Sequence, residues 1–368
     1  MENKKIRAIG AAVLAAVWGG LALGAWFLPA KETSDAERRE LAQMPEADAE
    51  AVLDGSFMSD FEDYALDQFP LRDGFRTLKS LAHYYALGFS DNNDIYIAGG
   101  SAVKQEYPLD TGSVDYALGR FDHIYEKYLK DSGSAAYMAV VPDKGYYLGG
   151  SSGHLIMDYE AMFTQLREGM PWASWIDLTD VLSAESYYRT DTHWRQETLL
   201  AAAGRLCQAM GVTGPESGEW TATALERPFY GVYYGQAALP LAADTMYLME
   251  SDVLSQCTVT NFETGKTAAV YDLTKLASKD LYEVFLSGSV SLLEIENPSA
   301  GTDRELVIFR DSFGSAMAPL LVQDYAKVTL VDIRYLSPEL LGKYVDFHGQ
   351  DVLFLYSTLV LNNSSTIK

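Results

Sequence analysis

Two short stretches of the sequence hold side chains that could carry out acid–base and nucleophilic chemistry. The stretch YYRTDTHWRQET, residues 187–198, contains Asp191 and His193, and this histidine is one of only five in 368 residues. The stretch RDSFG, residues 310–314, contains Ser312 after an apolar run. A serine hydroxyl becomes a strong nucleophile when a neutral histidine accepts its proton and a carboxylate orients that histidine. The three residues therefore form a candidate catalytic set.

The Asp191-x-His193 spacing is compatible with three kinds of site. In an extended segment, side chains two residues apart point the same way, and the carboxylate can also curl back onto Nδ1 of the histidine. As an alternative, Asp191 caps the helix that follows and His193 is a surface residue. A metal site is the third, but it needs further ligands, and the other histidines are scattered singly: His83, His123, His154 and His348.

No metal and no cofactor is predicted from the other motifs. Neither cysteine, Cys207 or Cys257, lies in a Cys-x-x-Cys motif, and no glycine-rich phosphate-binding loop is present. The two cysteines are compatible with one disulfide or with two buried thiols. The 28 basic and 51 acidic residues give a net charge of −23, which argues against nucleic-acid binding.

Ser312 is predicted to lie at a strand-to-helix turn. Residues 306–309 are apolar and predict a strand, and residues 316–322 predict a helix. In open α/β sheets the working surface lies at the C-terminal ends of the strands. The free N–H groups at the start of such a helix, including that of Gly314, can stabilise a developing oxyanion. The alternative is that Ser312 only caps this helix.

The elements that would position these residues indicate one α/β domain. Residues 135–141 predict a buried strand, and residues 197–210 predict a helix preceded by the loop that carries Asp191 and His193. The final segment alternates strand, helix, strand, helix and strand, which is typical of parallel βαβ units. Residues 239–293 suggest a β-meander, within a β-rich insertion spanning about 212–300.

The N-terminus predicts a single membrane anchor. Three basic residues precede an uncharged run of 23 residues, 8–30, which is long enough to cross about 30 Å of hydrocarbon as a helix. This charge distribution places the rest of the chain outside the cytoplasm. A cleaved signal peptide is the alternative. Residues 1–30 are therefore expected to form the anchor, 31–55 a polar juxtamembrane linker, and 56–368 the soluble domain.

Several motifs in a fixed order resemble one protein family. They are ERRELAQMP, SFMSDFEDYALDQFPLRDGFRTLK, VVPDK, YYRTDTHW and RDSFG, and together they extend over nearly the whole chain. In this order they resemble the DHHW proteins, which are related to the alginate O-acetyltransferases AlgX and AlgJ in the SGNH-hydrolase superfamily. The resemblance implies a three-layer α/β domain with a parallel sheet. It also implies a triad in the order Asp, His, Ser, permuted relative to ordinary SGNH hydrolases.

The resemblance assigns roles to particular residues of this sequence. Asp191, His193 and Ser312 match the catalytic triad of the family. Two departures are visible: Thr192 replaces the second His of the family name, and Arg310 replaces the Gly of a Gly-Asp-Ser block, where it could crowd the site or bind an anionic group. Further candidates for oxyanion stabilisation or substrate binding are Arg334, Asn362, Trp194 as a sugar platform, and Lys144.

The function expected from the resemblance is O-acetylation of a cell-surface or secreted polysaccharide. Ser312 would carry the acetyl group between donor and acceptor. The partners implied are a polysaccharide acceptor, the membrane through residues 1–30, and a membrane-bound O-acyltransferase that supplies acetyl groups. One alternative is a carbohydrate acetyl esterase with the same triad, which differs only in whether water is excluded from the acceptor pocket. Another is a non-catalytic glycan-binding or assembly protein.

Overall fold

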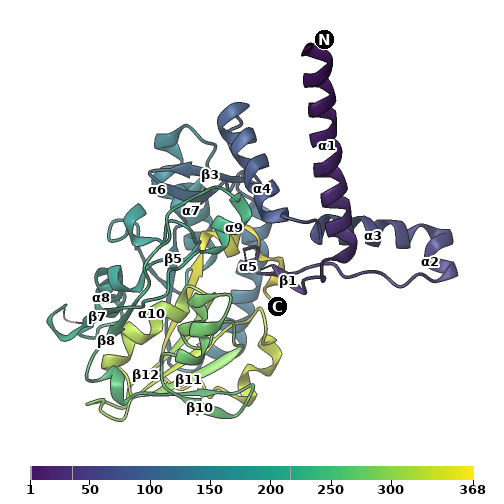
Figure 1. The fold of residues 1–368 in the computed structure, drawn as a ribbon. Coiled ribbons are helices and arrows are strands. Elements are labelled where there is room, and N and C mark those ends of the chain that lie inside the picture. Colours follow the sequence, from purple (N-terminus) through teal and green to yellow (C-terminus); the bar gives the residue numbers. More distant parts are fainter. Residues whose placement is uncertain (1, 35, 216) are drawn as a thin grey trace. The chain divides into compact units, whose positions relative to one another are not determined.

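The computed structural model describes residues 2–34, 36–215 and 217–368 and divides into two compact units (Figure 1). The first unit comprises the chain up to Asn92 together with Tyr234–Pro240. The second unit comprises Asn93–Tyr233 and Leu241–Lys368. The boundary therefore falls at Asn92, whereas the sequence analysis began the soluble domain at residue 56. The domain limits given there stay a prediction.

The first unit consists mainly of helices. Its elements are α1 (Glu2–Phe27), β1 (Thr33–Ser34), β2 (Arg39–Glu40), α2 (Ala49–Asp54), α3 (Ser56–Asp67), α4 (Arg72–Leu81) and the π-helical turn η1 (Ala82–Ala86). Helix α1 is long and apolar enough to cross a membrane, and its stretch Lys4–Phe27 is not buried against the protein. Pro70 separates α3 from α4, as a residue that cannot continue a helix would.

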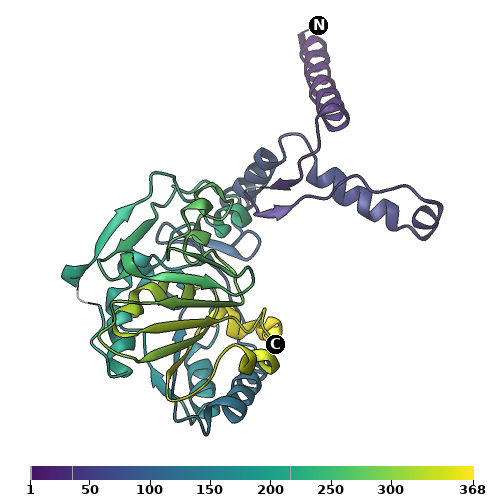
Figure 2. The same cartoon turned by 90° about the horizontal axis from the view of Figure 1, so that it is seen from below.

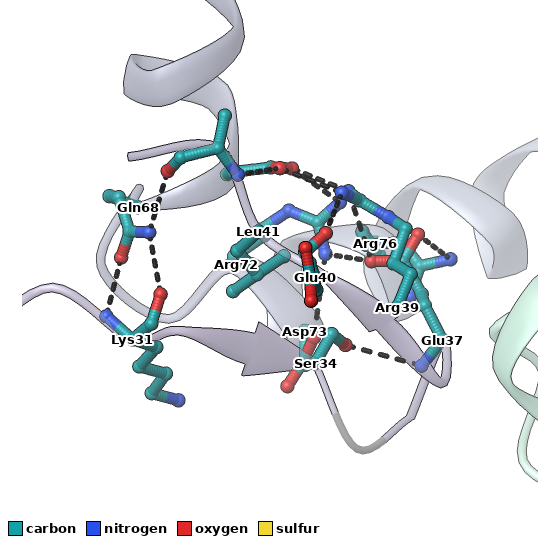
Figure 3. A network of polar contacts seen from close by, with 12 residues as sticks. Lys31, Ser34, Glu37, Arg39, Glu40, Leu41, Gln68, Arg72, Asp73 and Arg76 are labelled. Carbon is teal, nitrogen blue, oxygen red and sulfur yellow. Dashed lines mark hydrogen bonds and ion pairs between the residues drawn. The ribbon is translucent and has the colours of Figure 1, made fainter. Parts of the chain in front are cut away.

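Part of the segment predicted as a linker is held against α3 by specific polar contacts (Figure 3). Arg39 donates two hydrogen bonds to the carboxylate of Asp67, with N···O distances of 2.7 and 2.5 Å. The same carboxylate accepts the backbone N–H of Ala42 at 2.9 Å. The amide group of Gln68 accepts from the N–H of Lys31 and donates to the Lys31 carbonyl. Residues 31–42 are thus bonded to the end of α3 and are not a free tether.

Helix α4 joins the same network through its arginines. Arg72 forms an ion pair with Glu37, and Arg76 lies 3.3 Å from the other oxygen of that carboxylate. Arg72 also approaches Asp67 at 3.3 Å. The hydrogen bonds from Arg39 lower the pKa of Asp67 below its ordinary value. The first two motifs of the family resemblance therefore meet in this network, as complementary charges.

The second unit is built on an eight-stranded mixed sheet. Its strands, in spatial order, are β10 (Lys266–Ala268), β9 (Thr258–Asn261), β11 (Leu292–Glu296), β13 (Lys327–Val331), β12 (Glu305–Arg310), β14 (Asp351–Ser357), β5 (Ala135–Val141) and β6 (Ser174–Ile176). The five strands from β13 to β6 are parallel, and β11, β9 and β10 are added antiparallel. Two small antiparallel two-stranded sheets also belong to the unit, formed by β3 (Ile95–Ala98) with β4 (Ser101–Lys104) and by β7 (Thr221–Ala224) with β8 (Tyr247–Glu250).

Helices cover both faces of this sheet, which gives three layers (Figure 2). Along β12, Leu306 and Ile308 pack on one side, and Val307 and Phe309 pack on the other, as the period of two in a strand requires. One core contains α8 (Leu200–Ala209) and α10 (Gly314–Leu321), and the other contains α5 (Thr111–Ile124) and α7 (Tyr159–Gly169). Three short elements complete the outline: α6 (Lys144–Leu148), α9 (Val232–Ala237) and α11 (Thr358–Asn362).

The expected fold class is confirmed, and the segment predicted as a β-rich insertion contributes strands to the main sheet. Its last three strands extend the main sheet, with Leu292 of β11 paired with Val331 of β13. Leu292 packs into one core while Leu293 and Ile295 pack into the other, so β11 contributes to both cores at its start. Cys207 and Cys257 are buried free thiols.

The Asp67 network yields a prediction about the first unit. In Asp67→Ala, Arg39 and the Ala42 N–H lose their common acceptor, so residues 31–42 should open more often. Trypsin should then cleave after Arg38 and Arg39 on the order of 10-fold faster, because hydrogen bonds to charged groups contribute about 1.5–3 kcal/mol each. Mass spectrometry of the fragments measures this rate. Asp73→Ala is the matched control, since Asp73 is exposed and 3.9 Å from Arg72; equal rates in the two variants would contradict the prediction.

Candidate active site

The C-terminal edge of the parallel strands gathers the polar residues that the sequence analysis selected. Ser312 follows β12, Lys144 follows β5, and Arg334 follows β13. Because parallel strands all end at the same edge, these residues come together although they are far apart in sequence. The loop that carries Asp191 and His193 lies over this edge, and the phenol of Tyr187 donates to the carbonyl of Pro142 at the end of β5.

Asp191, His193 and Ser312 form a continuous hydrogen-bonded chain. Nδ1 of His193 lies 2.6 Å from Oδ1 of Asp191, and Nε2 lies 2.8 Å from Oγ of Ser312. Asp191 is fully buried and His193 is 8% exposed, while Ser312 is partly open to solvent. This order places the proton acceptor of the serine between the hydroxyl and a buried carboxylate, which is the geometry of a Ser–His–Asp triad.

The loop between Tyr187 and Trp194 folds back on itself. These two residues form an antiparallel bridge, and the Tyr188 N–H donates to the His193 carbonyl. At its tip, Oδ1 of Asp191 accepts hydrogen bonds from the backbone N–H and from Nδ1 of His193. The carboxylate thus curls back onto the histidine, the second of the two arrangements considered for this spacing. The helix-cap alternative is not what forms, because α8 starts only at Leu200.

A second segment completes the environment of Asp191. Oδ2 of Asp191 accepts the N–H of Val232 at 2.8 Å, and Oγ1 of Thr190 accepts the N–H of Gly231 at 2.9 Å. A Cβ atom at Gly231 would lie 2.2 Å from the Cβ of Asp191, so only glycine fits at this position. Thr192 points away from the pair, and its hydroxyl accepts a hydrogen bond from Tyr233.

The serine turn is fixed by the carboxylate of Asp311. Its Oδ1 accepts the N–H of Phe313 at 3.0 Å, and its Oδ2 accepts the N–H of Ser357 at the end of β14 at 2.8 Å. The carbonyl of Asp311 accepts the N–H of Gly314 at 3.1 Å. This N–H is therefore already used within the turn, which argues against Gly314 as an oxyanion donor in this arrangement.

Arg310 is buried beneath the turn and does not face a substrate. Its guanidinium donates to the carbonyls of Val290 and Asp311 and lies 3.7 Å from Asp332, and none of its side chain is exposed. Burial lowers the pKa of Arg310 below its ordinary value. A Cβ atom at Gly314 would lie 2.6 Å from the Cβ of Arg310, so the glycine leaves room for the arginine. The suggestions that Arg310 crowds Ser312 or binds an anion are therefore wrong.

Two further candidates, Trp194 and Asn362, are buried and form hydrogen bonds within the protein. Trp194 is fully buried and donates from Nε1 to the Phe313 carbonyl at 3.1 Å, so it cannot serve as a sugar platform. Asn362 accepts the N–H of Asp110 at 2.7 Å and donates to the Pro108 carbonyl at 3.2 Å. Its amide therefore ties α11 to the start of α5, which contradicts a role as oxyanion donor.

Arg334 and Lys144 lie at the expected edge but differ in access. Arg334 pairs with both oxygens of Asp332, at 2.9 and 2.7 Å, and 16% of its side chain is exposed. Its role in binding substrate stays a prediction. Lys144 is only 2% exposed and donates to the carbonyl of Tyr188. Burial lowers the pKa of Lys144 to about 7. This lysine supports the Asp191 loop from beneath, and so it is not a pocket residue.

Sequence reasoning did not find the aromatic residue that lies against the histidine. The ring of Tyr282 stacks on the imidazole of His193, with centroids 3.8 Å apart and planes 10° from parallel. Phe313 approaches the same imidazole at 5.1 Å. Tyr282 belongs to the 3₁₀ turn η9 (Leu281–Val284), which Asp280 caps. Nothing in the sequence marks this tyrosine among 24, because only the tertiary fold brings it to His193.

No triplet of metal-ligating side chains occurs in residues 2–34, 36–215 and 217–368. This search covered histidine, cysteine, aspartate and glutamate. It therefore gives no three-ligand set around Asp191 and His193 within these ranges.

Comparison with solved structures shows that the fold is shared with two proteins. A DHHW family protein from Eubacterium siraeum DSM 15702 is 21% identical with a TM-score of 0.61, and the match covers 75% of this chain and 95% of that chain. Bacillus cereus PatB1 with a sulfonyl adduct is 15% identical with a TM-score of 0.59, covering 73% and 97%. The O-acetyltransferase domain of Pseudomonas putida AlgJ is also matched, at 14% identity, 73% and 92% coverage and a TM-score of 0.44.

A search of curated proteins found no matching relative. Comparison with protein families matches residues 178–331 to the family described as DHHW protein. This stretch contains Asp191, His193 and Ser312, and one of the proteins of similar fold carries the same family name. Residues 178–331 are therefore similar to the DHHW family.

Proposed function

We propose that this chain is an O-acetyltransferase that acts on a polysaccharide outside the cytoplasmic membrane. The observation that carries the proposal is the hydrogen-bonded chain from Asp191 through His193 to the partly open hydroxyl of Ser312. Such a series of hydrogen bonds activates a serine for acyl transfer. The series lies at the strand edge where α/β folds bind substrates. The polysaccharide comes from the motif resemblance, which implies a glycan as the acceptor.

In the first half-reaction, Ser312 takes the acetyl group. Nε2 of His193 accepts the hydroxyl proton while Oγ attacks the acetyl carbonyl of the donor ester. The C–O bond to the donor then breaks, and the same proton passes from His193 to the departing oxygen. Asp191 stabilises the imidazolium that exists between these transfers. The result is acetyl-Ser312 and a free donor hydroxyl.

In the second half-reaction, a sugar hydroxyl replaces the donor. His193 accepts its proton, the sugar oxygen attacks the acetyl carbonyl, and the proton returns to Ser312 as the ester bond breaks.

The membrane location is part of the proposal. Helix α1 would act as an uncleaved signal anchor, with the basic residues before it in the cytoplasm and the rest of the chain outside. An acetyl donor delivered by a membrane-bound O-acyltransferase partner would fit this location.

The geometry also bears on the non-catalytic alternative. Arg310, the departure from the family's Gly-Asp-Ser block, has its guanidinium buried on the Val290 and Asp332 side. Ser312 has its hydrogen bond to His193 although Arg310 stands where the family has Gly. A catalytic function is therefore favoured over a purely structural one.

A sulfonyl fluoride should test the nucleophile directly, since Bacillus cereus PatB1 has been solved with a sulfonyl adduct. We expect one arylsulfonyl group per chain, located on Ser312 by peptide mapping. It should be absent in Ser312→Ala and form roughly 10²- to 10⁴-fold more slowly in His193→Ala, because the proton acceptor is lost. The matched control is His348→Ala, whose imidazole is exposed and outside the site. Equal labelling in His193→Ala and His348→Ala would contradict a working triad.

Transfer and hydrolysis can be separated with a small acetyl ester and a panel of oligosaccharides. We expect acetate release to fall when a suitable acceptor is added, with acetylated oligosaccharide appearing in equal amount. The reason is that both acceptors compete for the same acetyl-Ser312. Mass spectrometry of the sugars and an acetate assay give the two rates. Rapid acetate release that no oligosaccharide diverts would make the chain an esterase.

A further inference from the structure

Two oppositely charged side chains hold the turn from which the catalytic pair projects. On one side, Nζ of Lys144 donates to the carbonyls of Tyr188 at 2.9 Å and Arg189 at 3.4 Å. On the other side, the carboxylate of Asp244 accepts the N–H groups of Arg189 at 3.0 Å and Thr190 at 2.9 Å. Asp244 also accepts the hydroxyl of Thr190 at 2.6 Å. Residues 188–190 are thus bonded through both their donors and their acceptors.

We propose that Lys144 and Asp244 are positioning residues, which fix residues 188–190 so that Asp191 and His193 meet Ser312. This inference rests on the proposed function, but it concerns residues that touch neither the substrate nor the reacting atoms. Their effect passes through the backbone to the next residue, Asp191. Hydrogen bonds of the reacting groups must hold their geometry closely, since a shift of 1 Å can cost about 10²-fold in rate.

The surroundings of Lys144 show that its ammonium group is held in place and shielded. It lies 5.0 Å from the centre of the Tyr233 ring, and the Tyr233 hydroxyl donates to Thr192 in the same loop. Burying an ammonium group is unfavourable unless hydrogen bonds and opposite charges compensate. Here two carbonyls supply the hydrogen bonds, and the carboxylates of Asp143, Asp191 and Asp244 supply the charge.

Asp244 is delivered by the segment that the sequence analysis treated as an insertion. It pairs with Phe229 in an isolated antiparallel bridge, and both backbone hydrogen bonds between the two residues are 2.9 Å. The residues after Phe229 include Gly231 and Val232, whose N–H groups bond to Thr190 and Asp191. Gly231, Val232 and Asp244 therefore bond to three consecutive residues of the catalytic loop. These residues are Arg189, Thr190 and Asp191.

A double-mutant cycle tests the proposal. In Lys144→Met and Asp244→Asn, kcat for a small acetyl ester should fall about 10- to 10²-fold with KM nearly unchanged, because the substrate contacts remain. The double variant should lose less than the product of the two single losses, since both act on one turn. The matched controls are Lys343→Met and Asp346→Asn, two exposed residues elsewhere in the second unit. Additive losses, or losses confined to KM, would overturn the proposal.

A second readout does not require activity. The proton that His193 shares with Asp191 at 2.6 Å should give a low-field proton NMR resonance, assigned by its loss in His193→Gln. We expect it to broaden or move upfield in Lys144→Met and Asp244→Asn while the fold is retained by circular dichroism. An unchanged resonance in both variants would overturn the proposal. If the resonance changes in both variants but the wild-type protein transfers no acyl group, only the proposed function would be refuted.

The burial of Lys144 also predicts a dependence of stability on pH. The groups that face its ammonium are Asp143, Asp191, Asp244 and the Tyr233 ring, yet burial still lowers its pKa from 10.5 to about 7. Between about pH 7 and 10.5 the unfolded chain binds a proton at Lys144 that the folded chain has lost, so folding becomes more favourable as pH rises. Wild type should therefore gain stability relative to Lys144→Met across this range, measured by urea unfolding. A difference that stays constant over this pH range would contradict the prediction.

Discussion

The buried carboxylate of Asp191 is the constraint around which the site is arranged. A charge removed from water must be compensated by hydrogen bonds, and Asp191 is fully buried. One oxygen is satisfied by the backbone and ring of His193, and the other by the N–H of Val232. The histidine is thereby oriented toward Ser312. The segment around Val232 therefore helps to position the triad, although it contacts Asp191 through a backbone N–H.

The parts of the fold that could be predicted are those determined by local patterns. The apolar run 135–141 coincides with β5, and the strand expected at 306–309 lies within β12. The pairing of Ser312 with Asp191 and His193 was also accessible, because each lies in a recognisable motif at the end of a predictable element. Residues such as Asp244 and Tyr282 were not accessible. Their roles depend on contacts with residues far away in the sequence, and no periodicity records such contacts.

Two kinds of polar contact could not be predicted from composition. Residues 31–55 have the polar composition of a linker, but Arg39 and Asp67 form a bidentate ion pair across 28 positions. Trp194 and Arg310 belong to residue types common at surfaces and binding sites, but both are completely buried with hydrogen bonds to carbonyls. Composition describes average environments. It cannot show that a particular polar group has found a partner inside the protein.

The order of strands in the main sheet has a consequence for how the protein matures. Strand β14, which follows the other strands of this sheet in sequence, lies between β12, which precedes Ser312, and β5, which precedes Lys144. No other strand joins these two parts of the parallel sheet. A chain that emerges from its N-terminus can form each part separately, but it cannot unite them until β14 has been delivered. A chain without β14 would therefore lack the Ser357 N–H that bonds to Asp311 and helps to fix the turn of Ser312.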